Sequence, residues 1–276
     1  MASSSISKLP AHRTATPAAD DELRFRGWRG GRISTHRAFA RLHPTAGDLV
    51  GSALLLIGFS LLWIRLIPPV THLWARIFSF WAVHLNLQAP VAIVPQHWGR
   101  IELSIPYISL PAGPITPLTW SLTALVTAAI GAATEFFGEE RTPITYIVRA
   151  LVFLQASALV YFAFASARFP HSLPGYTVGM MVFGIILISL VPAILAFTFY
   201  VFDFVWWKKV GLTVVTMAHL TLLIPLQYVL HIYLLHHSIL FMPLLYFAFG
   251  PFLDVLVFVS LYSWGMSWRS RHDDLA

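Results

Sequence analysis

Six long apolar runs, separated by shorter polar segments, dominate the pattern of this 276-residue chain. A helix needs about 20 mainly apolar residues to cross the roughly 30 Å hydrocarbon core of a bilayer. Runs of that length occupy Ala46–Leu66, Pro117–Phe137, Pro143–Ser166, Val178–Phe202, Val210–Leu230 and Ile239–Ser263. The pattern therefore predicts an all-α polytopic membrane bundle of six spans within residues 48–265.

The long segment between the first two spans, residues 68–116, has a different pattern. Pro68 and Pro69 are expected to end the first span. Val70–Leu87 then places most of its large apolar residues near one helical face. This is typical of an amphipathic helix that lies in the membrane interface on the non-cytoplasmic side. Val91–Val94 and Gly99–Leu110 look extended, and the alternation in the second stretch predicts a short β ribbon.

Basic residues predict the orientation of the chain, because Lys and Arg concentrate in cytoplasmic segments. Thirteen of them fall on one side of the predicted bundle, eight of these in residues 1–47, against Arg76, Arg100 and Arg168 on the other. We therefore expect both termini in the cytoplasm, with the bundle in a bacterial inner (plasma) membrane. Residues 1–47 are expected to form a disordered basic cytoplasmic tail, and residues 266–276 a second cytoplasmic tail. The excess of basic residues is interpreted first as a topology signal, and we expect no nucleic-acid partner.

The chemistry available to the chain is narrow. It contains no cysteine, which excludes disulfides, thiolate metal sites and a cysteine nucleophile. It also lacks a phosphate-binding glycine loop, HExxH, GxSxG and a DxD-like acid pair. These absences argue against an ATPase, a zinc protease, a serine hydrolase and a sugar polymerase.

Arg149 lies inside the apolar stretch Thr142–Phe164. A charged side chain near the middle of a span costs about 2.5–3.5 kcal/mol on insertion scales, so this guanidinium must face a partner, a cavity or a substrate. Contact with a substrate and a structural pairing are both open. The candidate structural partners are Glu135, Glu139 and Glu140 near the preceding loop, with Gln155 and Ser157 as a polar path along the same helix.

Asp254 is the acid inside the last predicted span, and it is costly in lipid unless it faces the bundle. An ion pair with Arg65 of the first span is one way to neutralise the charge of Asp254. Asp203, at the inner end of the fourth span, is expected to be solvated beside Lys208.

Histidines gather where the fifth span is expected to reach the outer surface. His231, His236 and His237 lie at that end, and His171 lies in an outer loop. Imidazoles bind zinc, copper and haem iron, so a shared metal site is conceivable. Ordinary interfacial histidines beside aromatic residues are the plainer interpretation, and we expect no cofactor.

Three segments carry a pattern of small residues, arginine and histidine in a fixed order. YISLPAGPITPLTWSL supplies Gly113, RTPITYIVRALVF supplies Arg149, and FPHSLPGYTVGMMVFGIIL supplies His171 and Gly175. With the preceding helix and ribbon, this order resembles the exosortase/archaeosortase family over roughly Trp74–Leu195. Members of that family are multi-spanning membrane transpeptidases that process the C-terminal sorting tails of exported proteins.

The resemblance implies a site with Arg149 and His171 as catalytic residues and with Gly113, Arg149, His171 and Gly175 binding the substrate or partner. It also implies a cysteine two residues before the glycine of the first segment, and Pro111 stands there. A proline has no nucleophile to form an acyl-enzyme. Enzyme activity is therefore open, and the site is expected to be degenerate.

The function that follows from these residues is binding of a hydrophobic client helix or partner, without peptidase activity. The partners would be the lipid bilayer and a membrane protein client. One alternative is a structural or accessory subunit of a larger membrane complex. A second alternative is a metal- or haem-binding membrane protein that uses the outer histidines.

Overall fold

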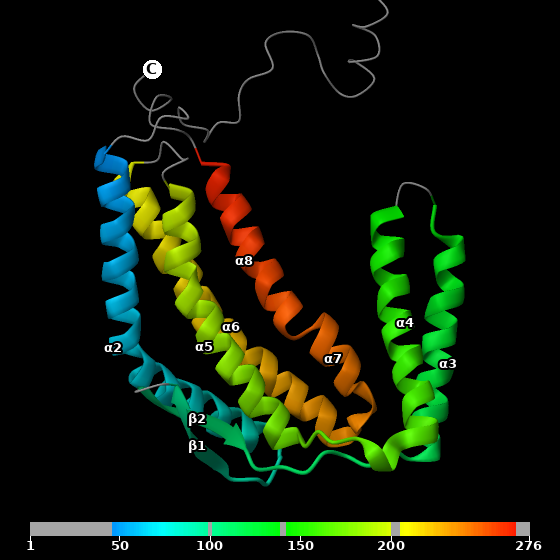
Figure 1. Ribbon diagram of the computed structural model, residues 1–276. Coiled ribbons are helices and arrows are strands. Elements are labelled where there is room, and N and C mark those ends of the chain that lie inside the picture. Colours follow the sequence, from blue (N-terminus) through cyan, green and yellow to red (C-terminus); the bar gives the residue numbers. More distant parts are fainter. Residues whose placement is uncertain (1–45, 99–100, 139–141, 200–204, 269–276) are drawn as a thin grey trace, which may run out of the picture. The chain divides into compact units, whose positions relative to one another are not determined.

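The computed structural model describes residues 46–98, 101–138, 142–199 and 205–268 (Figure 1). The predicted terminal tails therefore lie almost entirely outside the described residues. The elements are α2 (Ala46–His84), β1 (Val91–Trp98), β2 (Ile101–Ile108), α3 (Pro117–Ala133), η1 (Thr134–Phe136), α4 (Thr142–Ala165), η3 (Ser166–Arg168), α5 (Leu173–Phe199), α6 (Trp206–His237), η4 (Ile239–Phe241), α7 (Met242–Ala248) and α8 (Pro251–Met266).

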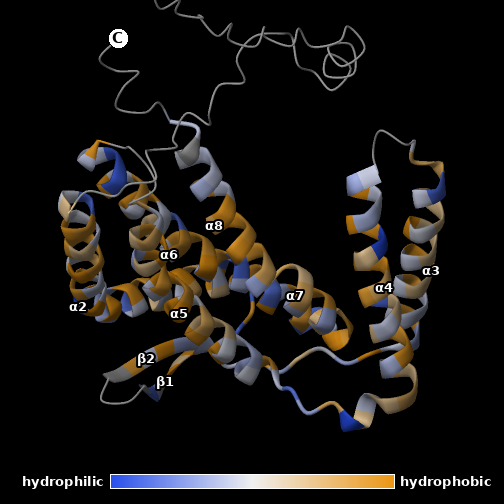
Figure 2. Cartoon of the chain, turned by 45° about the horizontal axis from the view of Figure 1, so that its top comes forward, coloured by the Kyte–Doolittle hydropathy of each residue, from blue (hydrophilic) through white to orange (hydrophobic). Residues whose placement is uncertain are grey.

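The predicted fold class is confirmed. Among the described residues, six helical segments are long and apolar enough to cross a membrane, and the sixth combines η4, α7 and α8. A two-stranded antiparallel ribbon accompanies them. Figure 2 shows that hydrophobic residues cover most of α8. Six helical segments of this length and apolar character are typical of an integral membrane protein.

The helix itself does not end at Pro68 and Pro69, because α2 continues through both prolines to His84. Figure 1 shows that α2 bends part-way along its length, as helices do at proline. Thr71 Oγ1 donates a hydrogen bond of 2.9 Å to the carbonyl of Pro68. Such a bond from a threonine to the preceding turn often accompanies a bend in a helix.

The second half of α2 packs against the bundle through the apolar face that the sequence predicts. Trp74 and Phe78 are fully buried. The Trp74 indole Nε1 donates a hydrogen bond of 2.8 Å to the carbonyl of Thr221 in α6. An indole buried in apolar surroundings needs such an acceptor, so this contact fixes the helix against α6.

The ribbon covers the same region. β1 and β2 pair in register from Val91 opposite Ile108 to Trp98 opposite Ile101. Leu103, Ile105 and Ile108 of β2 are buried, and β2 contacts both α2 and α5. The ribbon is therefore part of the packed core.

The helices α5 and α6 form the centre of the core. Both carry buried residues along their length, and α2 and α8 pack against them. Their separation depends on Gly184, where an added Cβ would lie 2.8 Å from Cγ2 of Ile224 in α6. A larger residue at this position would push the two helices apart.

The helices α3 and α4 form a hairpin. Trp120 Nε1 donates a hydrogen bond of 3.0 Å to the carbonyl of Leu159. Hydroxyl groups inside α3 bond to the preceding turn, as Thr127 Oγ1 does to the carbonyl of Thr123 at 2.7 Å. Such bonds satisfy polar side chains where no water is present. The helix α4 contacts α7 and η4.

We predict that Gly184→Ala destabilises the protein by about 1–3 kcal/mol, the usual cost of overpacking a close contact. Gly58→Ala in α2 is the matched control, because an added Cβ there meets nothing within 4 Å. Both changes raise helix propensity equally, so the difference between them isolates the packing cost. The free energy of unfolding in mixed detergent measures it, and equal values for both variants would contradict this role for Gly184.

Candidate functional site

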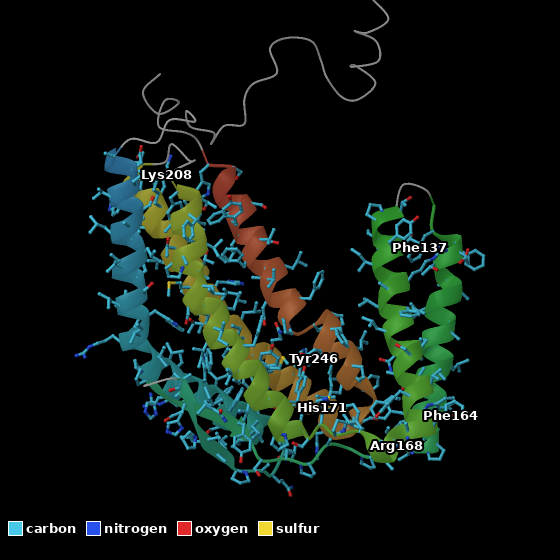
Figure 3. The ribbon with its side chains drawn as sticks, in the orientation of Figure 1. Phe137, Phe164, Arg168, His171, Lys208 and Tyr246 are labelled. Atoms are coloured by element: carbon cyan, nitrogen blue, oxygen red, sulfur yellow. The ribbon has the colours of Figure 1, made fainter. Side chains whose placement is uncertain are left out.

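A cavity of about 720 Å³ lies between the start of α5 and the helices α7 and α8. The α4–α5 connection forms one wall, and the break between α7 and α8 contributes Pro251. His171 and Tyr246, which Figure 3 labels, both line this cavity. Its other lining residues are Phe169, Pro170, Ser172, Gly175, Tyr176, Gly179, Met180, Phe183, Met242, Pro243 and Phe247.

The local sequence places His171 at the edge of the cavity. Ser172 precedes α5, and its hydroxyl Oγ accepts a hydrogen bond of 3.2 Å from the backbone N–H of Gly175. Serine is a favoured residue for capping the first turn of a helix in this way. The His171 ring then packs edge-on against Phe169, with ring centroids 5.3 Å apart.

A buried polar cluster lies directly behind the cavity wall. The Tyr176 hydroxyl and His231 Nδ1 are 2.8 Å apart and share a hydrogen bond. Tyr176 lines the cavity, whereas His231 is almost completely buried. The cavity therefore has a polar contact on one side within an otherwise mainly apolar lining.

Asp254 of α8 belongs to the same cluster and is fully buried. The Tyr228 hydroxyl donates to Asp254 Oδ2 at 3.3 Å. The prediction that Asp254 faces the bundle is confirmed, but its observed hydrogen-bond partner is Tyr228 rather than Arg65. Asp203 lies outside the described residues.

Arg149 has a structural partner. Its Nη2 lies 2.7 Å from Glu135 Oε1, and its Nε donates to Thr134 Oγ1 at 3.1 Å. The Arg149 side chain is 46% exposed and that of Glu135 71%. Both partners end the preceding helix of the hairpin, so this ion pair joins α4 to η1. Glu139 and Glu140 lie outside the described residues.

Gly113 is held against the end of α6. Its N–H donates to the carbonyl of Leu235 at 2.9 Å, and its own carbonyl accepts from the N–H of Ile239 at 3.1 Å. A Cβ at this position would collide with the backbone carbonyls of His236 and His237. Close backbone approach therefore explains the glycine.

The structure brings together two of the four predicted site residues. His171 and Gly175 line the cavity, whereas Gly113 and Arg149 do not. The sequence reasoning did not single out Tyr176, Gly179 or Tyr246. The interruption Gly250-Pro251 in the last span was the available signal for the wall that carries Tyr246.

The outer histidines do not form a metal centre in the described part of the chain, where no three His, Asp or Glu side chains gather closely enough to hold an ion. His231 bonds to Tyr176. His236 Nδ1 lies 3.3 Å from the carbonyl of Pro111, and His237 Nδ1 lies 2.9 Å from that of Tyr233.

Comparisons with protein-family models, with curated proteins and with solved structures found no match to this chain.

We predict that the Arg149–Glu135 pair couples α4 to α3 energetically. Arg149→Met and Glu135→Gln should each lower the stability, and the double variant should lose less than the two single losses combined. The coupling should be up to about 1 kcal/mol, because the pair is partly exposed. A double-mutant cycle measures it, and full additivity would assign Arg149 to some other contact.

Proposed function

We propose that this protein is an exosortase-like membrane protein that binds a hydrophobic segment of a client protein at the cavity beside His171, without cutting it. The observation that carries the proposal is the position of His171 and Gly175 on the wall of that cavity. These two residues come from the segment that resembles the histidine segment of the family. The resemblance and the cavity therefore point to the same place.

The lining suits an apolar ligand with few polar groups. Aromatic, methionine, proline and glycine residues supply most of it, while His171, Ser172, Tyr176 and Tyr246 supply polar atoms. The volume of about 720 Å³ falls within the usual range of ligand pockets. A helix is about 10–12 Å across with its side chains, so we infer that one face of a client helix inserts side chains.

The residues near the cavity favour binding over cleavage. The chain has no cysteine, and Pro111 occupies the expected place of the nucleophile. The Ser172 hydroxyl is already an acceptor for the backbone of α5. A serine nucleophile needs an adjacent base to take its proton, and no hydrogen bond between Ser172 and a histidine occurs among the described residues.

The distribution of basic residues supports one orientation of the chain in its membrane. We propose a bacterial inner (plasma) membrane with both termini in the cytoplasm, which places the ribbon outside. Every introduced cysteine is the sole thiol of the chain, because the natural sequence has none.

In intact cells, a membrane-impermeant maleimide should label Ser104→Cys on the exposed face of β2. It should leave Gly138→Cys, in the loop after α3, unlabelled until the cells are opened. Gly138 suits this test because a side chain there meets nothing within 4 Å. The opposite labelling pattern would reverse the proposed orientation.

Photo-crosslinking in living cells tests the client site. A benzophenone amino acid replaces Phe247, which lines the cavity, or Phe197, which is exposed on α5 and does not line it. Position 247 should give a discrete adduct with the hydrophobic segment of another membrane protein, and position 197 should not. Mass spectrometry of the adduct should find the client uncut.

Filling the cavity provides the matched control. Gly179→Trp places a large side chain where an added Cβ meets nothing within 4 Å, and Gly58→Trp does the same on α2, away from the cavity. Gly179→Trp should reduce the adduct by at least about tenfold, equivalent to about 1.4 kcal/mol of binding. Adducts with lipid alone, or equal adducts with both variants, would refute client binding at this cavity.

The alternative function, an accessory subunit of a membrane complex, has one observation in its favour. Along α3 the only buried residue is Thr127, and Leu118, Leu122 and Leu125 are exposed. A partner helix can cover such a face as well as lipid does. Protein adducts from a benzophenone at Leu125, with none from position 247, would favour this function.

A further inference from the structure

One histidine within α6 has no partner in the described part of the chain. His219 lies near the middle of the apolar run Val210–Leu230, and it is exposed. No hydrogen bond, ion pair or ring contact of His219 occurs among the described residues. Histidines inside membrane spans are rare, and almost all of them face other protein groups. The position of this imidazole therefore requires an explanation.

Other exposed histidines of the chain bond to their own helix. His84 Nδ1 lies 2.8 Å from the carbonyl of Phe80, one turn earlier, and His237 is placed in the same way. His219 has no such contact in the described structure, and the hydrocarbon of a bilayer offers neither a donor nor an acceptor. A polar group left unsatisfied in lipid costs free energy, which favours a partner on another helix.

The surface around His219 suits such a helix. Val215, Leu222 and Leu226 lie on the same side of α6 at spacings of four, three and four residues around His219, and they are 42%, 51% and 43% exposed. We call these four residues the outer face of α6. Polar side chains in membranes form hydrogen bonds across the contact between helices. One hydrogen-bonding group between apolar residues is therefore a suitable surface for a second helix.

A second copy of this chain carries the group that His219 needs. In a neutral imidazole one ring nitrogen donates and the other accepts, so one copy can supply the N–H that the other accepts. All copies insert in the membrane with the same orientation, which places both His219 side chains at the same depth. In a parallel pair with twofold symmetry, the same surface meets on both sides, so Val215 and Leu222 also meet apolar residues.

We propose that this protein forms a parallel dimer through the outer face of α6, in which the His219 imidazole of one copy donates a hydrogen bond to that of the other. The apolar residues on either side exclude lipid from this bond. The described residues that line the cavity all come from outside α6, so the dimer leaves the cavity open. The dimer is therefore independent of client binding.

Disulfide crosslinking in native membranes tests the contact. The natural chain has no cysteine, so Leu222→Cys places a sole thiol on the outer face of α6. Leu256→Cys is the matched control, because Leu256 of α8 is exposed to a similar extent, 48%. Mild oxidation should join Leu222→Cys into a homodimer with a yield at least about tenfold above that of Leu256→Cys, because the dimer holds the two thiols at a high effective concentration.

A second measurement isolates the hydrogen bond. The full chain is labelled at Ser104→Cys with a donor or an acceptor fluorophore, and energy transfer in phosphatidylethanolamine–phosphatidylglycerol vesicles gives the dissociation constant of the dimer. His219→Leu should raise this constant at least about threefold, equivalent to about 0.6 kcal/mol. His219→Asn should stay close to the wild type, because an amide also donates and accepts. His84→Leu is the control at a histidine that already has a partner, and it should change nothing.

Other results would overturn the proposal. Equal disulfide yields at positions 222 and 256 would mean that copies meet only by collision. An adduct of Leu222→Cys with a different protein would assign the outer face of α6 to that partner. A dissociation constant for His219→Leu equal to that of the wild type, or an equal loss in His219→Asn, would remove the hydrogen bond from the contact. Because His219 is exposed, these substitutions leave the packing of the bundle intact.

Discussion

The contact between α5 and α6 is the interaction on which the rest of the structure depends. Gly184 allows Ile224 to approach the backbone of α5, and residues on both sides of that point are buried. The helix α2 is fixed to this pair by two tryptophans, since Trp63 Nε1 donates to Ser189 Oγ of α5 and Trp74 Nε1 to a carbonyl of α6. The cavity is lined partly by α5, and the polar cluster includes residues of α5 and α6. The distance between these two helices therefore affects the geometry of both.

Most buried polar side chains in the bundle form hydrogen bonds with backbone carbonyls nearby. Serine and threonine hydroxyls donate to carbonyls one turn earlier, and Lys209 Nζ donates to the carbonyl of Phe199 at the end of α5. A cation at a helix C-terminus is favoured by the helix dipole. Against this background, five buried polar side-chain atoms have no hydrogen-bond partner among the described residues, and Asp254 Oδ1 is the one that belongs to a carboxyl group.

The sequence was sufficient for the features that depend on length and periodicity. Six spans follow from apolar runs, the ribbon from alternation, and the buried face of α2 from the spacing of Trp74 and Phe78. The path of α2 through Pro68 and Pro69 was not predictable, because the packing of the following turns against α6 outweighs the lost hydrogen bonds. The sequence included Glu135 among the possible partners of Arg149, but only the fold decided between that ion pair and a place in the cavity.

The candidate site likewise contains some residues that the sequence could predict and others that it could not. His171 and Gly175 were singled out by a local pattern, and both line one cavity because they lie at the same end of α5. Gly113 was singled out by the same pattern, yet its surroundings come from α6, about 120 residues later in the chain. No periodicity within residues 109–116 carries information on that distant contact, so spatial convergence could not be inferred from spacing.

The position of Gly113 also has a consequence for the order in which the protein assembles. Its two backbone hydrogen bonds are made with Leu235 and Ile239, which the ribosome adds about 120 residues after the glycine. At roughly 5–20 residues per second, that delay is about 6–25 s. During this interval the second, third and fourth spans are synthesised, while the connection between the first and second lacks both of its partners. The arrival of α6 therefore completes a connection made much earlier, and the amino-terminal half reaches its final form only when the fifth span is in place.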